Sequence, residues 1–190
     1  MKKIILLFVA GLLTYSVCAQ DTISKPKMLL RPFVENGANF IRNDNLKRVY
    51  NTQSMYFFGA GLRFGHPDFQ NYIPYAQYTY SSFEKNSPDS LVVENHKLKI
   101  QQISVGLDFP VYKFKNLQLR MQVGGDIGMI QESSYTIDDY SAGFHAGIGL
   151  DKKLISHSRI YARFSYNYQK TIDTYIHDFD VMKLAIGVVI

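Results

Sequence analysis

The sequence predicts an all-β fold: an eight-stranded antiparallel up-and-down transmembrane β-barrel preceded by a signal-peptide helix. Three observations carry this prediction. The chain begins with a short basic and then apolar segment, and its remaining residues alternate apolar and polar side chains. The connections between the alternating segments are long and short in turn. A period of two is that of a β-strand, because successive side chains of a strand point to opposite faces.

The amino-terminal segment has the features of a secretory signal. Two lysines precede the apolar run 4–13, and small residues lead to Ala19, so we expect cleavage between Ala19 and Gln20. The apolar run is shorter than the about 20 residues of a transmembrane helix. Two alternatives stay open at this point: a retained anchor helix, and a lipoprotein signal that ends at Cys18.

The expected cleavage gives a signal peptide over residues 1–19 and one barrel domain over residues 20–190. The only cysteine, Cys18, lies in the signal, so the barrel domain has no disulfide, thiol nucleophile or thiolate metal site. The chain has a formal charge of +5, and no basic run is interleaved with aromatics, so we expect no nucleic-acid partner. Its 14 Tyr and 13 Phe favour strands.

Alternation divides residues 20–190 into eight segments of strand length. The clearest is 117–129, where Leu119, Met121 and Val123 share one face and the polar residues between them share the other. The first segment has an ambiguous apolar face. The expected strands are 27–41, 55–64, 72–82, 98–109, 117–129, 142–150, 160–168 and 182–190.

One of these segments breaks the alternation. Leu98 and Ile100 occupy even positions, whereas the apolar residues from Ile103 onward occupy odd positions. A β-bulge adds one residue to one strand and so restores a common apolar face. We therefore predict a bulge near Gln101 and Gln102.

The connections between segments alternate in length, as in outer-membrane barrels with short periplasmic turns and longer outer loops. The expected long connections are 42–53, 83–96, 131–139 and 170–180, the short ones are 66–68 and 112–116, and 152–159 is intermediate.

Residue types indicate which face meets lipid. The polar face is rich in Gly, Ser, Gln, Asn and Arg and poor in Lys and Glu, which suits a crowded lumen better than a solvated surface. Aromatic residues of the apolar face gather at strand ends, as in membrane-interface girdles. They are Tyr56, Tyr78, Tyr80, Tyr166 and Tyr168 near the long connections, and Phe64, Tyr72 and Phe109 near the short ones. The alternative is a secreted soluble lipocalin-like barrel that binds an apolar ligand.

The signal segment, the eight alternating strands, the loop lengths and the apolar last strand resemble the small outer-membrane barrels of the OmpA-like and porin-family type. The resemblance is one of pattern and spans residues 20–190, although such barrels commonly end in an aromatic residue and this chain ends in Ile190. It implies a monomer in the outer membrane, surrounded by outer-membrane lipid and inserted by the barrel-insertion machinery. It further implies a structural or surface-interaction role, with an extracellular ligand held by the long loops, or slow passage of small solutes.

The polar face also predicts a charge network inside the barrel. Buried charges are tolerated when they are paired. We expect Asp108 and Asp126 to bridge the arginines in a structural network, in preference to a gated ion path. The members are Arg63, Asp108, Arg120, Asp126, Arg163 and Lys183, with Arg31 and Glu35 as further candidates.

No residue pattern predicts catalysis, a cofactor or a metal. His145 is expected in the lumen as a hydrogen-bonded interior histidine. His157 and Ser158 could suggest a lipid-modifying barrel enzyme, but they lie in an expected periplasmic turn, whereas lipid A occupies the outer leaflet. Four aspartates of expected outer loops lack the spacing of a calcium loop: Asp138, Asp139, Asp178 and Asp180. We therefore expect no enzyme.

Overall fold

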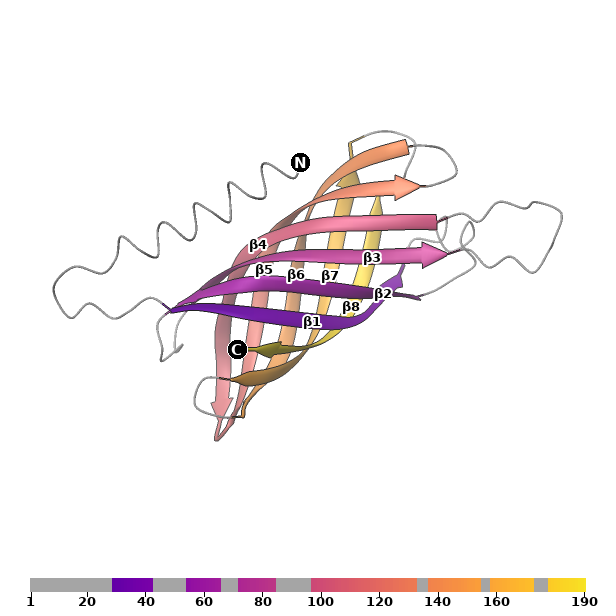
Figure 1. Cartoon of the computed structure of the whole chain (residues 1–190). Helices are drawn as coiled ribbons and strands as arrows, with labels where there is room; N and C mark the ends of the chain where they lie inside the picture. Colours follow the sequence, from indigo (N-terminus) through magenta and orange to yellow (C-terminus); the bar gives the residue numbers. More distant parts are fainter. Residues whose placement is uncertain are drawn as a thin grey trace.

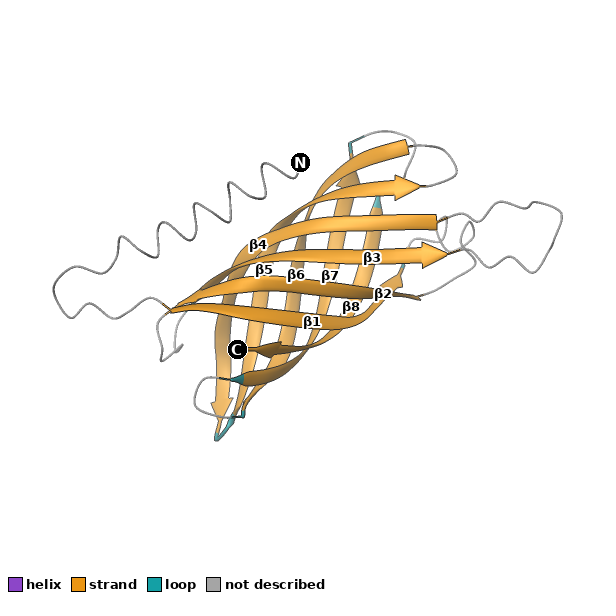
Figure 2. Ribbon diagram, in the orientation of Figure 1, coloured by secondary structure: helices purple, strands orange, loops and turns teal. Residues whose placement is uncertain are grey.

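Eight strands close into a barrel in the computed structural model, which describes residues 29–42, 54–65, 72–84, 97–132, 137–154, 158–172 and 178–190 (Figures 1 and 2). Each strand pairs antiparallel with its neighbours in the chain, and β1 pairs with β8. The strands are β1 Leu29–Ile41, β2 Ser54–Gly65, β3 Ile73–Glu84, β4 Lys97–Phe114, β5 Leu117–Glu132, β6 Ile137–Lys153, β7 Arg159–Thr171 and β8 Phe179–Val189.

The predicted fold class is thereby confirmed, as an antiparallel up-and-down barrel of eight strands. Among the described residues, no helix is long and apolar enough to cross a bilayer. The predicted signal peptide and its cleavage between Ala19 and Gln20 lie outside the described residues.

Several strands are longer than the alternation predicted. β5 and β6 pair as far as Glu132 and Ile137, so most of the expected connection 131–139 belongs to strands. β4 and β5 meet in a two-residue turn in which Lys115 has a φ of 49°. Such left-handed backbone suits two-residue hairpin turns, because their twist matches that of the flanking strands.

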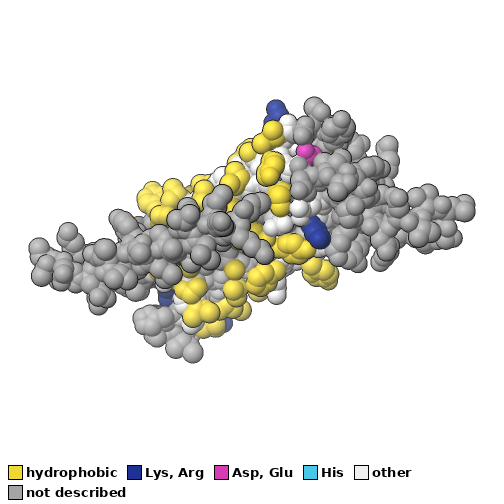
Figure 3. Space-filling model, turned by 45° about the horizontal axis from the view of Figure 1, so that its top comes forward, with side chains coloured by type: hydrophobic (Ala, Val, Ile, Leu, Met, Phe, Trp, Pro, Cys, Tyr) yellow, Lys and Arg dark blue, Asp and Glu magenta, His cyan; other side chains and the backbone are white. Residues whose placement is uncertain are grey.

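The outer face of the barrel is apolar. Tyr56 on β2 and Ile127 on β5 are 86% and 62% exposed, and hydrophobic side chains gather over the strands in Figure 3. β1, whose apolar face was ambiguous in the sequence, also has an apolar outer face, since Leu30 and Val34 point outward while Glu35 is buried in the lumen. Strands of a barrel alternate between the two sides, so each strand contributes to both surfaces.

The predicted bulge near Gln101 and Gln102 is wrong. Pairing between β4 and β5 runs without a shift through both residues, and the register changes instead between Pro110 and Tyr112. Ile100 keeps the parity of the strand and lies buried inside the barrel. The prediction failed because it placed every apolar residue on the outer face, whereas the lumen is itself apolar at this level.

Six apolar side chains fill the lumen near the long connections, and we call them the apolar layer. They lie close to the ends of their strands on that side, on β1, β2, β4, β5 and β8. All six are at most 7% exposed: Ile41, Met55, Leu98, Ile100, Ile130 and Val181.

A second buried group lies toward the short turns and combines Phe33, Tyr75, Tyr161 and Val189. The Tyr161 ring lies over Gly187 of the neighbouring strand, where a Cβ would overlap it. Phe33 meets Tyr161 edge to face, with ring centroids 6.4 Å apart. Large rings beside glycines thus fill a lumen that eight strands leave just wide enough for side chains.

Candidate functional site

The polar side chains of the lumen form the candidate site. The six residues of the predicted network are all buried there, on β2, β4, β5, β7 and β8. The two further candidates, Arg31 and Glu35, are buried beside them on β1. The structure arranges all of these side chains except Arg31 in three groups.

The first group surrounds Glu35 of β1, whose side chain is fully buried. Its carboxylate pairs with the guanidinium of Arg163 and lies 3.0 Å from Lys183 Nζ. It also accepts hydrogen bonds from Tyr161 Oη, at 2.8 Å, and from Gln77 Nε2. Donors from three other strands therefore converge on one carboxylate, and this Glu35 group contains two cations for one anion.

The second group lies toward the short turns, around Asp108 of β4. Arg63 Nη2 lies 3.3 Å from Asp108 Oδ2, and Arg120 Nε lies 2.6 Å from Oδ1. Arg63 also reaches Asp151 of β6, at 3.3 Å from Nη1. Asp108 thus bridges two arginines as predicted from the sequence, and Arg63 in turn bridges two carboxylates.

Tyr161 connects these two groups. The guanidinium groups of Arg63 and Arg163 lie over its ring, at 4.8 and 5.3 Å from the centroid, while its hydroxyl donates to Glu35. Cations over an aromatic face are attracted by its quadrupole, more strongly where water is excluded. One side chain therefore positions cations of both groups.

The third group corrects the expectation for Asp126, which pairs with a histidine and not with an arginine. Asp126 Oδ1 lies 2.7 Å from His145 Nδ1, and the opposite ring nitrogen contacts the Tyr75 hydroxyl. His145 is paired across the strands with Gly124, where a Cβ would lie 2.6 Å from its ring. The missing side chain at Gly124 lets the imidazole lie beside Asp126. The other carboxylate oxygen has no hydrogen-bond partner within the described strands.

Some members of the site escaped the sequence analysis. Asp151 lies one residue beyond the expected end of its strand, yet it continues the inward parity of His145. Extending that alternation by one residue would have found it. Arg159 was assigned to a connection, although it begins β7 and donates to Gln118 Oε1 at 2.9 Å. Tyr161 and Tyr75 have the parity of the polar face, but they were missed as partners because the predicted network included only charged side chains.

The residues weighed for catalysis and metal binding are placed as follows. Ser158 lies between β6 and β7, and His157 is outside the described residues. Asp139 was expected in an outer loop, but the structure shows it buried on β6. Asp178 and Asp180 accept hydrogen bonds from Tyr168 and Tyr166 at the rim of the barrel. In the described part of the chain, no three acidic, histidine or cysteine side chains are arranged to hold a metal ion.

Comparison with known proteins places this architecture among small outer-membrane barrels. No family model matches the chain, and no curated protein matches it. The crystal structure of Neisserial surface protein A matches with a TM-score of 0.58 at 11% identity, over 85% of this chain and 96% of that one. Ail, the attachment invasion locus protein of Yersinia pestis, solved with the heparin analogue sucrose octasulfate, matches with a TM-score of 0.53 at 14% identity, over 85% and 98%. The chain has the fold of these small eight-stranded outer-membrane β-barrels.

Proposed function

We propose that this chain is a non-enzymatic protein of the bacterial outer membrane, exported with a cleaved signal peptide, that acts in the envelope by structural or surface interaction. One observation carries the proposal: the barrel is apolar outside and filled with paired charges inside. A closed barrel satisfies the backbone hydrogen bonds of every strand, which is the condition for crossing a bilayer with strands. An apolar outer face is then stabilised by lipid.

The same distribution speaks against a soluble carrier of apolar ligands. Such a carrier needs an apolar cavity inside and a polar surface outside. Here Glu35, Arg63 and Arg163 occupy the lumen, while Phe58 and Phe144 are more than half exposed on the outer face. A single-residue change of register would reverse both faces, so the pattern is strongly specified.

The filled lumen favours a surface role over solute passage. The apolar layer fills part of the lumen on the long-loop side, with Ile130 only 1% exposed. We infer that contacts with other molecules take place at the long-loop end, outside the lumen. At its rim Arg42 lies 3.8 Å from Asp180, and Tyr168 donates to Asp178.

Membrane fractionation combined with electrophoresis of unheated and heated samples tests the location. We expect the protein in the outer-membrane fraction, released by detergent, with a faster band when unheated because a closed barrel resists unfolding by dodecyl sulfate. Recovery in the soluble periplasm without detergent would contradict the proposal. Detection of the barrel with an intact amino-terminal segment would contradict the cleaved signal.

Two further measurements test the role. In planar bilayers, refolded protein should give no steady conductance, because side chains close the lumen. A stable open level would contradict the closed lumen. Mass spectra of lipid A from cells with and without the gene should be identical, and a mass difference would show that the barrel modifies lipid.

A further inference from the structure

The β4–β5 hairpin extends past β3 at the short-turn end of the barrel (Figure 1). β4 pairs with β3 as far as Asp108 and then continues to Phe114. The register shift between Pro110 and Tyr112 lies in this extension and pairs Tyr112 with Leu119 of β5. A bulge re-aims the side chains that follow it, so Tyr112 and Phe114 lie on the outer face instead of the lumen face.

Two lysines lie beside apolar side chains on the outer face of this extension. Phe114 pairs with Leu117 of β5, and Leu117 pairs with Lys152 of β6, so these three side chains form one row. Lys115 Nζ lies 5.6 Å from the centroid of the Phe114 ring, a position in which the ring attracts the cation. Both lysines are exposed, and Tyr112 and Phe114 are more than half exposed. We call this surface the basic hairpin face, defined by Tyr112, Phe114, Lys115, Leu117 and Lys152.

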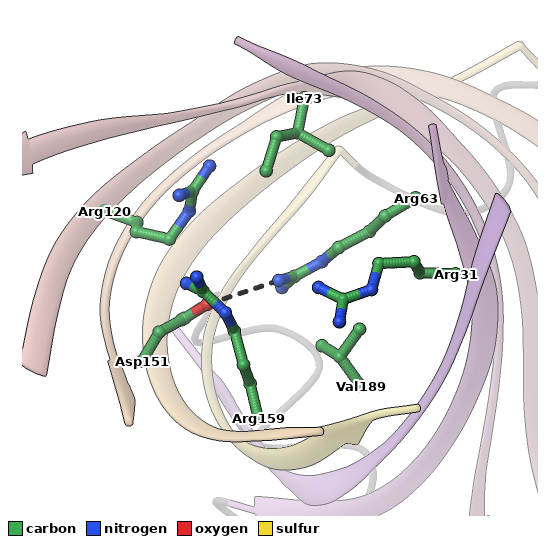
Figure 4. Close-up of a pocket in the computed structure, with 7 residues that line it drawn as sticks. All are labelled: Arg31, Arg63, Ile73, Arg120, Asp151, Arg159 and Val189. Carbon is green, nitrogen blue, oxygen red and sulfur yellow. Dashed lines mark hydrogen bonds and ion pairs between the residues drawn. The ribbon is translucent and has the colours of Figure 1, made fainter. Parts of the chain in front are cut away.

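The carboxylates that the structure describes at this end are turned into the lumen. Asp151 pairs there with Arg63, and Asp108 is buried against the same guanidinium group (Figure 4). Within the described ranges, neither Lys115 nor Lys152 forms an ion pair, and no carboxylate is exposed at the short-turn end. The outer face of this end therefore carries positive charge that its described neighbours do not neutralise.

We propose that the basic hairpin face binds the headgroup of an anionic phospholipid. The net negative charge of such a headgroup matches Lys115 and Lys152, while the acyl chains meet Phe114 and Leu117 of the same row. A soluble acidic partner would leave these apolar side chains in water, so the charge and the apolar surface together favour a lipid. Short turns of outer-membrane barrels face the periplasm. The lipid therefore belongs to the inner leaflet, and the site rests on the outer-membrane location proposed above.

Native mass spectrometry of the barrel with bound lipid tests the site. The whole barrel is refolded in a maltoside detergent that contains equal amounts of phosphatidylglycerol and phosphatidylcholine, which differ in the charge of the headgroup. A lysine near anionic headgroups favours them by about fivefold. We therefore expect the wild type to retain phosphatidylglycerol over phosphatidylcholine by on the order of twentyfold. The double variant K115Q/K152Q should retain the two lipids about equally.

The double variant K113Q/K153Q is the matched control, because it removes the same charge from the same end. Lys113 pairs with the inward Gln118, and Lys153 has the inward parity of Asp151, so both lie on the lumen side. This variant should keep the preference of the wild type for phosphatidylglycerol. Heat-modifiable migration checks that both variants are folded.

Three outcomes would overturn the proposal. The first is a wild type that retains both lipids equally, and the second is an unchanged preference in K115Q/K152Q. The third is an equal loss in both double variants, which would show a diffuse effect of charge at this end and no site on the outer face. The site and the location fail separately, because fractionation alone decides the location, whereas the choice between two lipids decides the site.

Discussion

The two ends of the lumen are filled by different interactions. Toward the long loops, the apolar layer packs Leu98, Ile100 and Ile130 with three further side chains. Toward the short turns, Arg63, Asp108 and Asp151 form a chain of ion pairs. Burial of apolar surface is non-directional, whereas buried ion pairs depend on the geometry and number of their partners.

This difference suggests a division of roles. The ion pairs around Glu35 and Asp108 are buried, so water and salt screen them little. Toward the short turns, Arg63 contacts both Asp108 and Asp151, so one substitution there changes two ion pairs. We therefore expect substitutions of charged residues to differ widely in effect, whereas substitutions in the apolar layer should follow the volume removed.

The largest effect is expected for Glu35→Ala. The variant leaves Arg163 and Lys183 buried together without their shared carboxylate. Removing one partner of a buried ion pair costs about 3–5 kcal/mol, so the free energy of unfolding should fall by that amount. Urea titration of protein refolded in micelles, followed by heat-modifiable migration, measures it. E35Q, which keeps the shape of the side chain, should lose less, and an unchanged midpoint for E35A would contradict the central role of Glu35.

A somewhat smaller loss is expected for Ile130→Ala in the apolar layer. Ile130 is 1% exposed, so truncation leaves a cavity and should lower the free energy of unfolding by about 2–4 kcal/mol. I127A is the matched control: Ile127 lies on the same strand but is 62% exposed on the outer face, and its truncation should cost less than about 1 kcal/mol. Equal losses in the same urea titration would contradict the packing of the apolar layer.

The same comparison explains how far the sequence could predict this molecule. Alternation predicts the strands and the outer face, because burial against lipid demands apolar residues on one side throughout. It failed at Leu98 and Ile100, because the lumen changes from polar to apolar along its length. The sequence of a single strand does not show how far along the lumen each residue lies. Only the neighbouring strands, joined by barrel closure, show that Ile41 and Val181 lie at the same level.

Residue pairing was less predictable than residue placement. The alternation of each strand predicted which charged side chains point into the lumen. The partner of each charge, however, depends on the register between strands and on the space that neighbouring side chains leave. Asp126 could have paired with an arginine, yet the gap over Gly124 admits the ring of His145. Glu35 was only a further candidate, because its strand had no clear apolar face, and the structure shows it in contact with four donors.

For Asp126→Ala we expect an intermediate loss. His145 Nδ1 would lose its partner, but one oxygen of the Asp126 carboxylate already lacks a hydrogen bond within the described strands. The free energy of unfolding should therefore fall by about 1–3 kcal/mol, the cost of one buried donor left unpaired. Urea titration at neutral pH measures it, with E35A in parallel. A loss as large as that of E35A would show that Asp126, and not Glu35, is the central carboxylate of the lumen.

The smallest effect is expected for Arg159→Gln, although it removes a full charge from the lumen. Arg159 donates to the uncharged Gln118, and its charged neighbours are the Asp151 and Asp108 carboxylates as well as the Arg120 and Arg63 guanidinium groups. Its loss therefore removes a hydrogen bond and an attraction but also relieves a repulsion. The two contributions oppose each other, and the free energy of unfolding should change by less than about 1 kcal/mol. R63Q is the contrasting variant, because Arg63 contacts both Asp108 and Asp151 and its loss leaves Asp151 without that cation. If R159Q destabilised the barrel as much as R63Q in urea titrations, Arg159 would be an essential part of the ion-pair chain, and the expected compensation between attraction and repulsion would be wrong.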